Sequence, residues 1–248
     1  MLFRSNAQLD AYIGAIASTI EFVRAKKRSK KRVTISFDEW NVWYEQSETT
    51  RAAPEGWPVG PALFEQRYSV ADAVVVGGLL IALMRHSDRV VSANLAQLVN
   101  VIAPIMTEAN GDAWRQTTYY PFAQAAASAA GSVLLSKLDA PVVGTAKWGE
   151  VPVVDAVATH DPDQGEMALF IVNRSVDQDV QLTVRIPGVR PMRIASATVL
   201  CDDDPYRIAR VDASVSPRVN EFVECDEAGL RITLPPVSWN VVKLVTNR

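Results

Sequence analysis

The first third of the chain carries hydrophobic residues at helix spacing and then at strand spacing. Over residues 6–27 apolar side chains recur every three or four positions, which predicts an amphipathic helix with one apolar face: Leu9, Ile13, Ile16, Ile20 and Val23. The segment "RVTISF" (32–37) is short, apolar and rich in β-branched residues, which predicts a buried strand. We expect a long loop to follow through about residue 66, because prolines stand at positions 54, 58 and 61.

A second helix and a second strand continue this alternation. The run "VADAVVVGGLLIALM" (70–84) is apolar on all sides, which predicts a helix over 69–85 that is packed on several faces. Ser69, with Asp72 three residues on, predicts its capped start. "RVVSANLAQLV" (89–99) predicts a second strand, and 119–135 a further helix. This order is typical of a parallel α/β unit and, more narrowly, of the end of a β/α barrel.

After about residue 136 the pattern changes to short alternating segments divided by Pro, Gly, Asp and Asn turns. These segments predict an antiparallel β-sandwich: "VPVVDAVATH", "MALFIVNRS", "QDVQLTVRIP", "RIASATVL" and "LRITLPP…WNVVKLV". We therefore expect two domains, an α/β domain at 1–136 and an all-β domain at 137–248. Trp239 on the last strand should be buried, between the sheets or against the α/β domain.

Charge and cysteine content exclude several classes of protein. The formal net charge is only −3, which favours neither nucleic acid nor a membrane surface as the partner. The basic run "RAKKRSKKR" (24–32) is predicted to be a solvated helix end. Two cysteines and two histidines do not form a zinc pattern. "MLFRSNAQLD" contains no apolar core of a secretory signal, which indicates a cytoplasmic protein.

Candidate chemistry lies where the two predicted strands end. Asp38 and Glu39 end the first strand, and large aromatic residues follow them directly: Trp40, Trp43 and Tyr44. Gln97 and Asn100 end the second strand. Carboxylates beside aromatic rings suit sugars, whose C–H faces stack on rings, and glycoside hydrolysis uses paired carboxylates. The same spacing also fits a strand-end acid that caps a loop in front of an aromatic core.

Three blocks of the chain resemble a known enzyme family. "SFDEWNVWY", "LAQLVNVIAPIMTEANGDAWRQTTYYPF" (95–122) and "LPPVSWNVVKL" (234–244) resemble the α-L-arabinofuranosidases of glycoside hydrolase family 51. The resemblance implies a (β/α)8 barrel joined to a β-sandwich. It also implies a retaining enzyme that removes terminal arabinofuranosyl groups from arabinan or arabinoxylan oligosaccharides, and it implies neither a metal nor a cofactor.

The resemblance assigns roles to individual residues. It places the catalytic nucleophile at Glu39, a substrate-pocket aromatic at Trp43 and a sugar-contacting amide at Gln97. Asp38 is expected to orient or balance charge, because neighbouring strand residues point to opposite faces. The family's acid/base, a Glu preceded by Asn on an earlier barrel strand, has no counterpart before residue 32. Asn220-Glu221 matches it in letters only, since it lies in the predicted sandwich.

The chain therefore looks like the carboxyl-terminal half of such an enzyme, with the last two of eight barrel strands. We expect the missing amino-terminal barrel half as a partner and a homo-oligomer once the enzyme is complete. Two alternatives stay open. One is a non-catalytic module that holds carbohydrate or a partner subunit, and the other is a glycosidase with another sugar specificity.

Overall fold

The computed structural model describes residues 4–44, 56–57, 59, 61, 64–187, 192–226 and 229–246. Its helices are α1 (Arg4–Lys26), α2 (Val70–Arg85) and α3 (Tyr119–Ser128). The strands of the first half are β1 (Ile35–Trp40), β2 (Val90–Leu95), β3 (Ile105–Thr107), β4 (Ala113–Arg115) and β5 (Ser132–Val133). Those of the second half are β6 (Val142–Thr145), β7 (Gly149–Pro152), β8 (Val154–Asp161), β9 (Glu166–Asn173), β10 (Val180–Val184), β11 (Met192–Leu200), β12 (Arg218–Val219), β13 (Val223–Asp226), β14 (Gly229–Leu234) and β15 (Ser238–Thr246).

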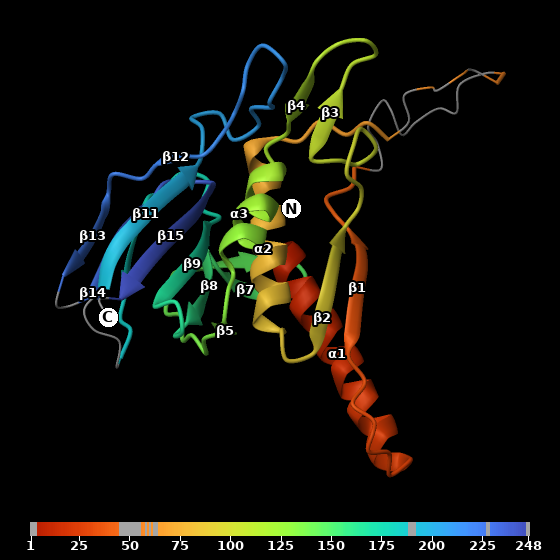
Figure 1. Cartoon of the computed structure of the whole chain (residues 1–248), viewed down its shortest axis with the longest axis vertical. Helices are drawn as coiled ribbons and strands as arrows, with labels where there is room; N and C mark the ends of the chain where they lie inside the picture. The colour runs from red at the N-terminus through yellow and green to blue at the C-terminus, as the bar shows by residue number, and fades with distance from the viewer. Residues whose placement is uncertain are drawn as a thin grey trace.

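The elements form layers around the central helix α2 (Figure 1). On one side of the helices lies a parallel pair made of β1 and β2. On the other side lies a six-stranded sheet in the order β12-β11-β15-β9-β8-β5, and beyond it a three-stranded sheet in the order β10-β14-β13. No helix within the described ranges is long and apolar enough to cross a membrane.

The two larger sheets pack face to face as a β-sandwich, as the sequence predicted. Their shared core joins buried side chains of β9 and β15 with those of β14: Met167, Leu169, Ile171, Val242, Leu244, Leu230, Ile232 and Leu234. The sandwich prediction is therefore confirmed. The residue boundary predicted at 136 stays a prediction, and β5, at Ser132–Val133, already pairs with β8 of this sandwich.

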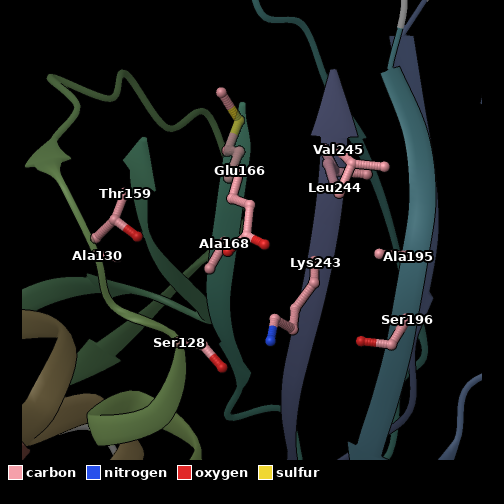
Figure 2. Close-up of a pocket in the computed structure, with 11 residues that line it drawn as sticks. Ser128, Ala130, Thr159, Glu166, Ala168, Ala195, Ser196, Lys243, Leu244 and Val245 are labelled. Carbon is pink, nitrogen blue, oxygen red and sulfur yellow. The ribbon is translucent and has the colours of Figure 1, made fainter. Parts of the chain in front are cut away.

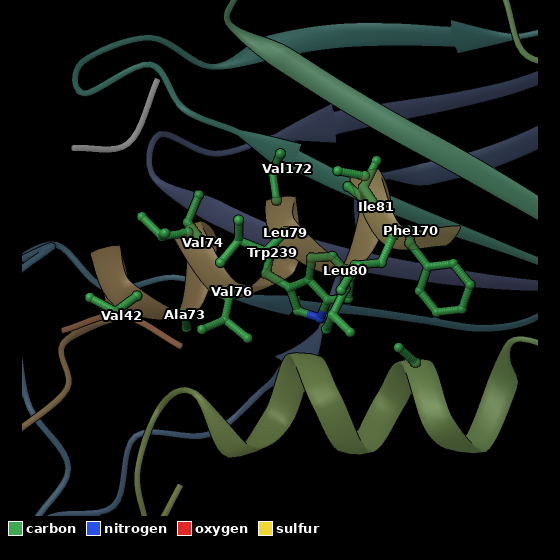
Figure 3. Close-up of a cluster of buried hydrophobic side chains, with 14 of the residues drawn as sticks. Val42, Ala73, Val74, Val76, Leu79, Leu80, Ile81, Phe170, Val172 and Trp239 are labelled. Carbon is green, nitrogen blue, oxygen red and sulfur yellow. The ribbon is translucent and has the colours of Figure 1, made fainter. Parts of the chain in front are cut away.

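The second face of the six-stranded sheet is covered by the helices. Residues 72–83 of α2 are all buried, which confirms the predicted helix that is packed on several sides. Trp239 is completely buried between α2 and α3 (Figure 3), where its ring stacks on Phe170 and its indole N–H donates to Gln124 Oε1 at 2.8 Å. A Cβ on Gly77 would lie 2.3 Å from this ring, so the close approach of helix and sheet requires glycine there.

Charged and backbone groups connect α2 to its neighbours at both ends. Near its carboxyl end, Arg85 forms ion pairs with Asp10 of α1 and Asp155 of β8. At its amino end, the β11–β12 connection supplies acceptors: Val70 N–H donates to Arg207 O at 3.1 Å and Ala71 N–H to Pro205 O at 2.8 Å. These are two of the amide groups that no helix can satisfy internally. The sandwich therefore caps the helix that it covers.

The structure departs from the sequence prediction at the end of one helix and at one hairpin. The helix predicted over 119–135 ends at Ser128, because Gly131 takes a left-handed φ of +74° and turns the chain into β5. The hairpin of β3 and β4 was missed, although the Asn110-Gly111 dipeptide at its tip is a strong turn signal. Much of the loop predicted up to residue 66 lies outside the described residues.

Strand β9 also lacks the alternation that a sandwich strand usually shows. All its residues from Met167 to Asn173 are buried. One set of side chains faces the three-stranded sheet and the other faces α2, so neither face meets water. A strand covered on both faces is expected to be continuously apolar.

We expect Trp239→Ala to lower the free energy of unfolding by about 3–5 kcal/mol, the usual cost of removing a buried large aromatic. Urea denaturation of the chain measures the change. Phe222→Ala is the matched control, because Phe222 is 71% exposed and should change stability by less than about 0.5 kcal/mol. Equal effects of the two substitutions would contradict the central place of Trp239 in the core.

Candidate functional site

The candidate site lies at the carboxyl-terminal edge of the parallel pair, where β1 carries the two predicted carboxylates. Asp38 stands opposite Asn94 of β2, but the next pair joins Trp40 to Leu95. Glu39 is therefore an extra residue in β1, and its φ of +57° lies in the left-handed region. This geometry is that of a β-bulge, which re-aims side chains and is frequent beside active sites.

The bulge decides which side chains meet water. Strict alternation would place Glu39 on the same side as Phe37, whose ring packs edge-on against Tyr12 of α1 with a centroid separation of 6.2 Å. With the extra residue, Trp40 is buried instead and both Asp38 and Glu39 are exposed. Strand alternation was the reason to expect Asp38 and Glu39 on opposite faces, and the bulge interrupts that alternation at Glu39.

The two neighbouring carboxylates differ in their partners. Asp38 Oδ1 accepts hydrogen bonds from the Asn94 side-chain amide and from Ser36 Oγ, the latter at 3.0 Å. The Glu39 side chain makes no hydrogen bond or ion pair with any residue that the structure describes. Asp38 is therefore held in place within the sheet, whereas the Glu39 carboxylate is available to a molecule outside it.

The predicted aromatic and amide residues lie in the loops that follow these strands. Trp43 is 55% exposed and packs edge-on against Phe64, with ring centroids 6.1 Å apart. Gln97 is exposed two residues after β2, and its backbone N–H donates to Ile102 O at 3.2 Å. The structure thus places Glu39 near the end of β1, and Trp43 and Gln97 in the loops that follow β1 and β2.

Sequence reasoning missed two residues at this edge and misplaced one. Asn94, the partner of Asp38, lies nearer the end of β2 than Gln97 does, and its amide could have been noticed on the same grounds. Phe64, the ring beside Trp43, has no sequence signal, because the contact joins segments 21 residues apart in the chain. Asn100 instead binds the end of β3, where Thr107 N–H donates to Asn100 Oδ1 at 2.8 Å.

A buried carboxylate of α2 binds the loop that carries Trp43 and Tyr44. Asp72, in the first turn of α2, accepts hydrogen bonds from Tyr44 Oη at 2.5 Å and from Ser69 N–H at 2.7 Å. The capping box predicted for Ser69 and Asp72 is confirmed. Burial raises the pKa of Asp72, and the hydrogen bonds from Tyr44 and Ser69 oppose this shift. Burial, together with the Asp72 carboxylate, also raises the pKa of Tyr44, so its hydroxyl stays a donor.

Two depressions in the described surface lie away from this edge. One, of about 220 Å³, lies over β8, β9, β11 and β15 and is bordered by Thr159, Glu166, Ser196 and Lys243 (Figure 2). It contains no aromatic ring and none of the predicted site residues. The other is formed by the basic segment before β1. Neither of these two depressions therefore includes the candidate site.

Other candidate groups lie apart from this edge. Asn220 is buried in the sandwich, where its Oδ1 accepts from Phe222 N–H at 3.0 Å, and Glu221 beside it is exposed. Among the described residues no group of three or more His, Cys, Asp or Glu side chains is arranged to hold a metal ion. The chemistry available at the edge is therefore that of a free carboxylate, an exposed indole and an amide.

Comparison with known proteins gives consistent matches. Residues 38–238 match the family described as the alpha-L-arabinofuranosidase C-terminal domain. The chain is 43% identical over 246 residues to an exo-α-(1→6)-L-arabinofuranosidase of Bifidobacterium longum, covering 96% of this chain and 47% of the relative. It is 41% identical over 241 residues to an intracellular exo-α-(1→5)-L-arabinofuranosidase of Streptomyces lividans, covering 96% of this chain and 36% of that protein.

A solved structure agrees with these sequence matches. The family 51 α-L-arabinofuranosidase AbfB of Bifidobacterium longum superposes with a TM-score of 0.89 at 39% identity, covering 98% of this chain and 47% of that one. The chain thus spans about half the length, or less, of the relatives that it matches.

The raised pKa of Asp72 predicts a pH dependence of stability. With a raised pKa, the folded chain binds the proton of the Asp72 carboxyl group more tightly than the unfolded chain does. The contribution of Asp72 to stability therefore falls as the pH rises from about 4 through the folded-state pKa. The difference in unfolding free energy between the native chain and Asp72→Asn should therefore shrink with rising pH, by about 1.4 kcal/mol for each unit of pKa shift. Urea titrations between about pH 4 and 7 measure it. A difference that grows with pH would mean that the hydrogen bonds outweigh burial.

Proposed function

The chain belongs to the alpha-L-arabinofuranosidase C-terminal domain family, and on that premise we propose that it is the nucleophile-bearing portion of a retaining glycoside hydrolase. The reaction is the removal of α-L-arabinofuranosyl groups from the non-reducing ends of arabinan- or arabinoxylan-type oligosaccharides. The arabinofuranosidase names of the relatives support this sugar specificity.

The observation that carries the proposal is the difference between the two neighbouring carboxylates. Asp38 is engaged by Asn94 and Ser36, while Glu39 stands exposed on a bulge without a partner among the described residues. A nucleophile must be able to reach the anomeric carbon and form a bond to it. Glu39 meets this requirement, and the covalent glycosyl–enzyme intermediate forms on its carboxylate. Asp38 holds the strand end in place beside it.

The neighbouring side chains provide sugar recognition. Trp43 exposes more than half of its surface and packs against Phe64 with the two rings nearly perpendicular, so its ring is open to the C–H groups of a sugar. Gln97 carries both a donor and an acceptor, which suits vicinal hydroxyl groups. Neither role requires a metal or another cofactor.

The acid/base is proposed to lie outside this chain. Retaining hydrolysis requires a second carboxyl group roughly 5–5.5 Å from the nucleophile. Within the described residues β1 and β2 pair only with each other, and a parallel pair with two unpaired edges is not a stable sheet by itself. We take this pair to be the last two strands of a (β/α)8 barrel, ending near residue 136 and followed by the sandwich domain at 137–248. The remaining strands come from an amino-terminal half.

The names of the relatives bear on the location of the complete protein, whereas its assembly is a separate proposal. Relatives from Streptomyces lividans and Bifidobacterium longum are named intracellular enzymes, which supports a cytoplasmic location for the complete protein. A homo-oligomeric complete enzyme stays part of the proposal, and its test is the mass of that enzyme in solution.

We expect the chain alone to give negligible turnover of arabino-oligosaccharides, because no acid protonates the leaving oxygen. Co-expression with the amino-terminal half of the exo-α-(1→6)-L-arabinofuranosidase of Bifidobacterium longum should restore hydrolysis, measured as released arabinose. The same amino-terminal half without this chain is the control. Robust hydrolysis by the chain alone would refute the missing acid/base. Sugar binding without turnover in a well-folded complex would favour a carbohydrate-binding module.

In the complemented enzyme, Glu39→Ala should lower turnover of an aryl α-L-arabinofuranoside by about a thousandfold or more, because the bond-forming carboxylate is gone. Added azide should then form an arabinosyl azide of inverted configuration, as the anion enters the vacated space and the aryl oxide leaves. Asp38→Asn is the matched control and should retain measurable hydrolysis with retention. An azide product from Asp38 variants, with Glu39 variants still active, would move the nucleophile by one residue.

A further inference from the structure

We propose that Asn41 is a positioning residue that sets the place of Gln97 relative to Glu39. The inference rests on the proposed function, because it concerns the geometry of that site. Asn41 follows Glu39 by two residues, immediately after the end of β1, and its side chain is half-buried.

The Asn41 side chain joins the end of β1 to the loop after β2. Its Nδ2 donates to Ala96 O at 2.6 Å and to Ile102 O at 2.6 Å. Its Oδ1 accepts from the backbone N–H of Val42 at 2.8 Å. Both amide hydrogens and the carbonyl oxygen are thus used, so the orientation of the side chain is fixed from three directions.

The two acceptor carbonyls are those that hold the backbone of Gln97. Ala96 O belongs to the peptide group that immediately precedes Gln97. Ile102 O accepts a second hydrogen bond from Gln97 N–H itself, at 3.2 Å. Asn41 therefore donates to backbone carbonyls on both sides of Gln97 and forms no hydrogen bond with the Gln97 side chain. A shift of Asn41 would move the amide that is proposed to bind the sugar.

Ile102 also connects Asn41 to the aromatic residues of the site. Ile102 N–H donates to Phe64 O at 2.9 Å, and the Phe64 ring packs against Trp43. Ile102 takes a φ of +46°, which is unfavourable for a β-branched residue and persists only where surrounding contacts impose it. The hydrogen bond from Asn41 is one of these contacts.

Few residues other than asparagine could form this junction. An aspartate would direct carboxylate oxygens at two carbonyl oxygens, which repels, and it has no N–H to donate. An alanine would leave Ala96 O without the Asn41 donor. Asn41→Asp retains the shape of the side chain but replaces its two N–H donors with a charged acceptor, and it is the second variant if Asn41→Ala does not fold.

The first experiment measures how Asn41 holds the Gln97 backbone in the chain itself, and it does not depend on enzyme activity. Hydrogen exchange of the Gln97 backbone amide should become about tenfold faster in Asn41→Ala, because the loop that shields it loses two hydrogen bonds. Asn220→Ala is the matched control: Asn220 Nδ2 also donates to a backbone carbonyl, Thr233 O at 3.2 Å, and its Oδ1 accepts from a backbone N–H, but it lies in the sandwich. Unchanged exchange of Gln97 in both Asn41 variants would overturn the proposal.

The second experiment is a double-mutant cycle in the complemented enzyme. Asn41→Ala alone should lower kcat/KM for arabino-oligosaccharides by about 10- to 100-fold, as expected for a displaced binding group. In the Gln97→Ala background the same substitution should cost less than about threefold, because the group that it positions is gone. Asn220→Ala should leave kcat/KM unchanged in both backgrounds.

The outcomes separate this inference from the proposed function. Additive losses for Asn41 and Gln97 in an active enzyme would overturn the positioning role while leaving the glycosidase intact. An inactive but folded complemented enzyme would refute the proposed function, and the exchange experiment would still decide whether Asn41 holds Gln97.

Discussion

The close contact of Gly77 with Trp239 is the constraint on which the rest of the structure depends. A side chain as small as alanine at position 77 would place its Cβ 2.3 Å from the indole, so helix and sheet approach only because that space is empty. Gly78 plays the same part toward Asn6 of α1, where a Cβ would lie 2.3 Å from the amide. Through these two glycines α2 packs at once on the sandwich and on the helix beside the parallel pair.

This packing connects the sandwich to the candidate site through the amino end of α2. The β11–β12 connection satisfies the first amide groups of the helix, and Asp72 in the same turn binds the hydroxyl of Tyr44. Tyr68, just before the helix, donates from its hydroxyl to Val42 O at 2.7 Å. The loop that carries Trp43 is therefore anchored on a helix end that the sandwich has already fixed. The sandwich supports the proposed chemistry by holding this loop, without needing to touch the sugar.

At the candidate site, the different surroundings of two adjacent carboxylates arise from one extra residue. The bulge at Glu39 returns Trp40 to the core and leaves Asp38 bound to Asn94. A regular strand would have buried a carboxylate against α1, at a substantial cost in desolvation. The backbone of Glu39 accepts an uncommon conformation, and that conformation presents the carboxylate outward. Surrounding hydrogen bonds, including those of Asn41, hold the neighbouring loops around it.

The sequence by itself determined the local features whose causes lie within a few residues. The apolar run of α2, its Ser69–Asp72 cap, the two strands of the parallel pair and the sandwich strands all followed from periodicity and turn residues. The aromatic cluster after Asp38 and Glu39 gave the candidate site, which stays a prediction. Trp239 was expected in the core, but only the tertiary structure set it against Gly77 and Gln124. Likewise, only tertiary structure decided that Glu39 stands on a bulge, that Asp38 binds Asn94 and that Asn41 reaches Ala96 and Ile102. Each of these depends on the register between β1 and β2 or on loops more than 50 residues apart. Periodicity within one segment carries no information about such contacts, because they are set by the packing of segments that the chain brings together only when it folds.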